Sequence, residues 1–187
     1  MRVVWPMLLG GVLLLGGCSR ERAHRMLEAD STRVAQRDAG YTLLLDLLGD
    51  ESRVDGILLI KSLPKPVAEL VRAIADESQA AVGRLTDVLG QPPVVTPGND
   101  GLPLVEVEAR SRIRQWTTMA LLSGRGPELE RALLISQLQA VDSIRALCEA
   151  LIDQEASELR RTVLGEVLAG FSSLRSRIWA QLGAAAA

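Results

Sequence analysis

Apolar side chains recur at helical spacing along most of the chain, and this periodicity limits the fold more than any other feature. Clusters of glycine, proline and serine interrupt the pattern at residues 49–52, 62–66, 90–103 and 123–127. Amphipathic helices with short connections can bury their apolar faces only against one another. The sequence therefore predicts an all-α protein, an antiparallel helical bundle. The predicted helices cover residues 21–48, 54–61, 66–89, 104–122, 127–154 and 155–182.

Each long helix carries one apolar stripe. Pro66 suits the first turn of the helix over 66–89 and Gly90 suits its C-cap, so both ends are marked. The stripe of the helix over 21–48 could pack on the bundle or pair with another chain, whereas the segment 90–103 is expected to be a surface loop rather than a small hairpin. The helix over 104–122 is expected to pack within the bundle through a stripe formed by Val105, Ala109, Ile113, Trp116 and Ala120.

The N-terminus has the pattern of an export signal. One basic residue, Arg2, precedes an apolar run over residues 3–15 that is too short to span a bilayer. The run ends in Leu15-Gly16-Gly17-Cys18, which resembles the lipobox of bacterial lipoproteins. The resemblance implies cleavage after Gly17, acylation of Cys18 with lipid such as palmitate, and anchoring in the cell envelope, facing the periplasm. Alternatives are an ordinary cleaved signal with an incidental cysteine, or a short anchor helix.

The lipobox also sets the expected organisation of the chain. Residues 1–17 form the signal peptide, 18–40 a lipidated tether or helix, and 41–183 the bundle domain. Ser19 follows the cysteine, and the absence of aspartate there implies the outer rather than the inner membrane. Loss of the leader removes one arginine and changes the net charge from −2 to −3. Membrane lipid is therefore expected to be bound through acylated Cys18, not through charge.

Composition argues against nucleic acid as a partner. A net negative chain lacks the attraction to phosphate on which nucleic-acid binders rely, and aromatic residues make up only 3% of the sequence. The expected partner besides lipid is an envelope protein or a second copy of the chain.

The order of the helices, two on each side of a proline-rich crossover, resembles ferritin-like four-helix-bundle proteins of the bacterial envelope. Metal-binding members of that fold use inward glutamates and Glu-x-x-His pairs. Here the only histidine, His24, precedes the bundle, and the apolar faces carry the neutral Ser78 and Gln137. These two are expected to hydrogen-bond to a backbone carbonyl or to each other. The resemblance therefore implies the helix arrangement without its metal chemistry.

Carboxylates are the only remaining candidate metal ligands, and those of Asp142, Glu149 and Asp153 fall on one flank of their helix. Beside Arg145 they are expected to form a charge-paired, solvated surface rather than a metal or acid–base site. The acidic residues Asp76, Glu77, Glu155 and Glu158 have the same status. Cys148, among apolar neighbours, is expected to be a buried thiol. No catalytic constellation or cofactor motif is found, so the sequence predicts a non-enzymatic structural or interaction module. A degenerate ferritin-like protein that binds metal or a small ligand is the alternative.

Overall fold

The structure is a computed structural model that describes residues 17–98 and 102–184, with side chains from Ser31 onward. The predicted signal-peptide core lies outside the described residues, as do the side chains of Cys18 and His24. The chain divides into two units, residues 1–34 and 35–187. The boundary falls inside helix α1 (Gly17–Glu51). In the first unit, the described residues 17–34 are helical, and the side chain of Val34 is exposed.

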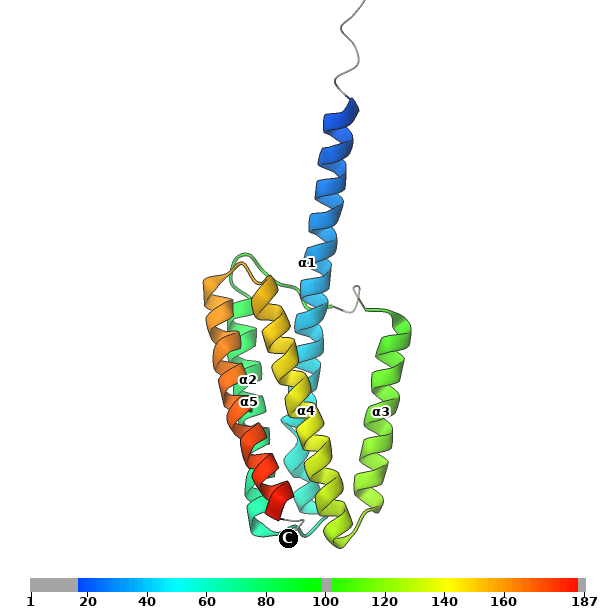
Figure 1. The fold of residues 1–187 in the computed structure, drawn as a ribbon, viewed down its shortest axis with the longest axis vertical. Coiled ribbons are helices and arrows are strands. Elements are labelled where there is room, and N and C mark those ends of the chain that lie inside the picture. The colour runs from blue at the N-terminus through cyan, green and yellow to red at the C-terminus, as the bar shows by residue number, and fades with distance from the viewer. Residues whose placement is uncertain (1–16, 99–101, 185–187) are drawn as a thin grey trace, which may run out of the picture. The chain divides into compact units, whose positions relative to one another are not determined.

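The second unit contains the rest of α1 and all later elements (Figure 1). These are the 3₁₀ helix η1 (Val54–Leu59) and the helices α2 (Lys65–Leu89), α3 (Leu104–Ser123), α4 (Gly126–Gln154) and α5 (Glu158–Ala184). The described residues contain no strand, so the segment before α3 is a loop as far as it is described. The predicted all-α bundle is confirmed.

The connection that contains α3 determines the order of the helices in space. It returns the chain to the end of the bundle at which α2 began, so α2 and α4 run in the same direction (Figure 1). Helix α5 runs opposite to both and packs against both. The buried side of α1 contributes Tyr41, Leu44 and Leu48 to the same core. Helices α1, α2, α4 and α5 thus enclose one apolar interior.

The core contains the apolar stripes predicted for α2, α4 and α5 and the part of the α1 stripe from Tyr41 to Leu48, whereas Val34 of the same stripe is exposed. The stripe of α2 is buried from Val67 to Leu89, and the helix begins and ends beside Pro66 and Gly90 as predicted. The thiol of Cys148 is fully buried on α4. Other core side chains come from α2, α4 and α5: Leu70, Ile74, Leu85, Leu133, Leu134, Val141, Ile144, Leu164, Val167, Phe171 and Ile178.

Helix α5 begins at Glu158, three residues later than predicted. Ser157 caps it, because its hydroxyl accepts a hydrogen bond from the backbone N–H of Arg160 at 3.4 Å. Glu155 therefore belongs to the connection between α4 and α5, and not to the first turn of the last helix.

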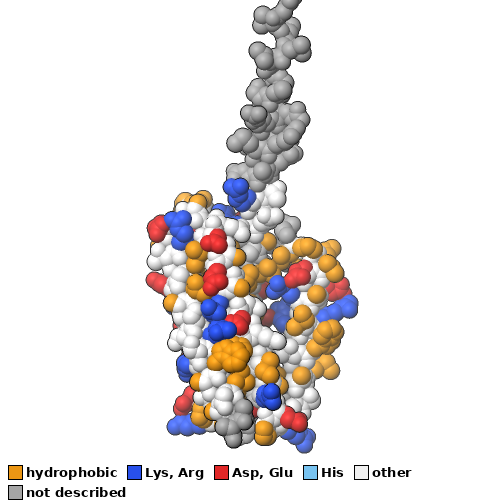
Figure 2. Space-filling view, viewed as in Figure 1, with side chains coloured by type: hydrophobic (Ala, Val, Ile, Leu, Met, Phe, Trp, Pro, Cys, Tyr) orange, Lys and Arg blue, Asp and Glu red, His pale blue; other side chains and the backbone are white. Residues whose placement is uncertain are grey.

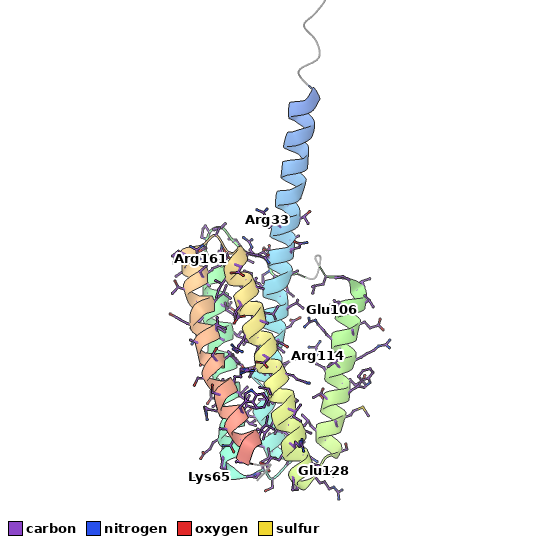
Figure 3. The ribbon with its side chains drawn as sticks, in the orientation of Figure 1. Arg33, Lys65, Glu106, Arg114, Glu128 and Arg161 are labelled. Atoms are coloured by element: carbon purple, nitrogen blue, oxygen red, sulfur yellow. The ribbon has the colours of Figure 1, made fainter. Side chains whose placement is uncertain are left out.

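Helix α3 forms over the predicted residues but does not join the bundle. None of its residues is buried. The expectation that its stripe packs within the bundle is therefore wrong. The physical reason is that the side of α3 nearest the other helices carries charged residues, including Glu106 and Arg114 (Figure 3), which would lose hydration if they were buried.

Candidate interaction surface

The exposed side of α3 gathers the apolar residues of its stripe. We call this surface the α3 outer face; it comprises Val105, Ala109, Ile113, Trp116, Met119 and Ala120, all exposed. Trp116 is 65% exposed and Val105 73%. Figure 2 shows hydrophobic side chains over this helix. At 100° per residue the six positions cover about 120° of the helix circumference. Arg112 also falls within this arc, between Val105 and Met119, so the face is apolar apart from one arginine, which contacts Glu108 at 2.6 Å.

The contacts of α3 with the bundle lie on the opposite side of the helix. Leu121 packs against the core, and Arg114 Nη1 donates to Asp50 Oδ2 of α1 at 2.7 Å. Both positions are about 140–160° around the helix from the centre of the outer face. The ammonium of Lys61 donates to the carbonyl oxygens of Leu122 at 2.6 Å and Gly124 at 3.0 Å. A cation thus binds the C-terminal carbonyls of α3 and fixes that end to the bundle.

The charges of α3 are paired locally. Arg110 and Arg112 each contact the glutamate four residues earlier, Glu106 at 2.8 Å and Glu108 at 2.6 Å. With Arg114 paired to Asp50, each of the three arginines of α3 has a carboxylate partner. The helix therefore presents a mainly apolar face whose one arginine, Arg112, is paired with Glu108.

Three polar side chains, those of Tyr41, Glu155 and Arg160, are buried together at one end of the bundle. Glu155 and Arg160 are 3% and 1% exposed, and Tyr41 is fully buried. Arg160 Nε and Nη2 donate to the two carboxylate oxygens of Glu155 at 2.9 and 3.0 Å. The Tyr41 hydroxyl and the Ser157 backbone N–H donate to the same carboxylate at 2.8 and 2.9 Å. Four hydrogen bonds thus compensate the buried negative charge.

These contacts shift the pKa of each partner. Burial alone would raise the pKa of Glu155, but hydrogen bonds from Arg160, Ser157 and Tyr41 outweigh it and lower the value to about 2. The hydrogen bond to Glu155 raises the pKa of Arg160. Burial first, and then the bond to Glu155, raises the pKa of Tyr41. The carboxylate and guanidinium therefore remain charged, as a buried ion pair.

The ion pair also holds the crossover between α2 and α3. Arg160 Nη1 donates to the carbonyl oxygen of Pro93 at 2.9 Å. Nearby, Val95 is buried, and its N–H donates to the Leu89 carbonyl at 3.1 Å. Glu155 was expected on a solvated surface, and that expectation is wrong. Its carboxylate is enclosed because it connects α1, the α4–α5 connection and the crossover, and this role stabilises the fold.

Three further polar side chains have buried atoms: Glu51 on α1, Ser78 on α2 and Gln137 on α4. Burial raises the pKa of Glu51 to about 7, against the effect of a hydrogen bond from Gln137. The hydroxyl of Ser78 and the amide oxygen of Gln137 are buried without a hydrogen-bond partner among the described residues. Both side chains are buried as predicted, but the expected partner for the Ser78 hydroxyl is not found. The reason is that apolar side chains surround it at the centre of its stripe.

Two of the three candidate metal ligands on α4 pair with arginine. Asp142 Oδ1 accepts from Arg175 Nε at 2.6 Å and from Arg145 Nη1 at 3.2 Å. Glu149 lies 3.9 Å from Arg145, and Asp153 is exposed. Within residues 17–98 and 102–184, no three histidine, cysteine, aspartate or glutamate side chains are placed to hold a metal ion. The structure thus places these carboxylates on a charge-paired surface.

Comparison with known proteins gives no relative: no protein-family model, curated protein or solved structure matches this chain. Among the described residues, no helix has the length and hydrophobicity needed to cross a bilayer. Sequence reasoning missed the importance of Arg160. A signal was present, since Arg160 occurs three and seven residues before Val163 and Val167 and so falls on their buried face.

Proposed function

We propose that this chain is a lipid-anchored helical-bundle protein of the bacterial envelope that acts as an interaction module and not as an enzyme. The observation that carries the interaction role is the α3 outer face, an apolar surface that the fold leaves exposed. Contiguous exposed apolar surface usually marks a binding site. The lipobox residues Leu15 to Cys18 support the anchor, and the serine after Cys18 supports the outer membrane.

The non-enzymatic role and the helix arrangement belong to the same proposal. The single histidine of the chain, His24, precedes the bundle domain, so the bundle itself has no imidazole for acid–base or metal chemistry. The crossover that makes α2 and α4 parallel supports a ferritin-like order of the four core helices.

Two measurements in cells test the proposal. Wild-type protein is expected to incorporate labelled fatty acid and to fractionate with membranes, whereas Cys18→Ala is expected to lose both properties. Absence of label from the wild type would refute the anchor. For the interaction role, a photo-crosslinking residue at position 116 is expected to give protein adducts. The matched control is position 179, because Trp179 is 51% exposed on α5. Equal adducts at both positions would refute the assignment to α3.

A further inference from the structure

We infer that the partner of the α3 outer face is a second copy of this chain, bound through an antiparallel pair of α3 helices. This inference rests on the proposed function, because it names the partner of the same surface. Its first support is the exposure of the face, since α3 has no buried residue and Trp116, Met119, Ile113 and Val105 are each more than half exposed.

The sizes of the side chains on the face are self-complementary. In a two-fold symmetric antiparallel pair, each residue i faces residue j of the other copy, and the sum of the two numbers is constant. An axis between residues 112 and 113, near the middle of α3, places Ala109 opposite Trp116 and Ala120 opposite Val105, each twice. Ala109 thus leaves room for the large Trp116 and Ala120 for Val105, as close packing of two helices requires, while Ile113 faces Arg112 beside the axis.

Charge favours a protein partner over a lipid surface. The mature chain is expected to carry a net negative charge, and Glu108 borders the outer face beside Met119. Helices that lie on membranes instead carry lysine and arginine on the polar side and bind anionic lipid. On α3 the three arginines are already paired with carboxylates. In the proposed register Arg112 of each copy lies beside the axis, opposite Ile113, and its ion pair with Glu108 supplies a counter-charge for each guanidinium.

The size of the surface sets the strength of the pair. One face of a helix about 30 Å long buries less than the roughly 800 Å² per partner of a standard interface. We therefore expect a weak dimer, with a Kd on the order of 10 µM in solution. Anchoring both copies to one membrane through Cys18 would raise their effective concentration and favour pairing.

Sedimentation equilibrium of the mature chain carrying Cys18→Ser, and hence no lipid, tests the inference directly. The wild-type face is expected to dimerise, and Trp116→Gln to raise the Kd at least about tenfold. Trp179→Gln, an equally large change at a similarly exposed tryptophan outside α3, is expected to leave the Kd unchanged. A monomer up to about 200 µM would overturn the inference, since this is well above the expected Kd. An equal loss in both tryptophan variants would overturn it as well.

Crosslinking tests the register in the lipidated full chain on membranes. Ile113→Cys lies beside the proposed axis and is expected to give a covalent dimer with a short bismaleimide. Leu104→Cys, although more exposed, would lie about 25 Å from its copy and is expected to give none. Cys148 is buried and does not compete. Equal dimer at both positions would contradict the register.

Two further outcomes would assign the face to a different partner and overturn the inference. One is that lipid-free protein remains monomeric but binds phosphatidylethanolamine–phosphatidylglycerol vesicles through Trp116. The other is that position 116 crosslinks in cells only to a different protein; this result would leave the proposed function intact.

Discussion

The buried ion pair of Glu155 and Arg160 makes the strongest prediction for stability. In Arg160→Met the Glu155 carboxylate would lose two hydrogen bonds and its counter-charge while it remained buried. Removing one partner of a buried pair typically costs about 3–5 kcal/mol. The pKa of Glu155 gives an independent value, because the difference between its ordinary value of 4.5 and about 2 corresponds to about 3 kcal/mol at neutral pH. We therefore expect Arg160→Met to lower the free energy of unfolding by about 3 kcal/mol or more.

Urea unfolding followed by circular dichroism measures this loss. Arg112→Met is a matched control, because it breaks an exposed ion pair and is expected to cost less than about 1 kcal/mol. Tyr41→Phe removes one hydrogen bond to the buried charge, and the expected cost is about 1.5–3 kcal/mol. An Arg160→Met cost no larger than that of Arg112→Met would refute the reasoning.

The pH dependence of the same variants provides a check on the sign. The folded state lowers the pKa of Glu155, so the carboxylate stabilises the protein above its ordinary pKa of 4.5, and this contribution is lost as the pH falls towards 2. The difference in stability between wild type and Arg160→Met should therefore be largest above pH 4.5 and shrink below it. A difference that stays constant down to pH 2 would contradict the assignment to Glu155.

Three further predictions concern other described sites. The folded state raises the pKa of Glu51 to about 7, so the protonated carboxyl stabilises the protein below pH 4.5, and this contribution is lost as the pH rises through 7. Urea titrations at pH 5 and pH 8 should therefore show a loss of as much as about 3 kcal/mol in the wild type, and Glu51→Gln should remove this loss. Gly126 has a φ of +56°, so Gly126→Ala should lower the free energy of unfolding by about 1–2 kcal/mol. Gly165 lies inside α5 with open space beside it, so Gly165→Ala should raise the free energy of unfolding by about 0.5–1 kcal/mol. Thermal unfolding that gave both changes the same sign would contradict this. Burial, and to a lesser degree the charge of Glu149, raises the pKa of Cys148 to about 12, so a thiol reagent at pH 8 should label it only after urea is added, and rapid labelling without urea would refute its burial.

The helices of this protein could be predicted from local sequence, because proline and glycine mark their ends and the apolar spacing marks their buried faces. Pro66 and Gly90 bracket α2 within one residue of the structure. The position of α3 could not be predicted in this way. Periodicity shows that Val105 and Trp116 share a face, but it does not show what that face contacts.

The buried ion pair was hidden for a related reason. Tyr41 and Glu155 are 114 residues apart, and no local pattern pairs residues at that separation. Glu155 also lies among several acidic residues that are exposed, including Asp153 and Glu158. Only the occurrence of Arg160 on the buried face of α5 indicated that a negative partner was needed inside the bundle.

The absence of buried residues from α3 separates two kinds of selection on this chain. Substitutions in the four core helices change stability, whereas substitutions at positions such as Ile113 or Trp116 leave the core packing untouched. The surface of α3 is therefore free to diverge among related chains without loss of folding. Two such chains with the same bundle could thus differ in the partners that they recognise.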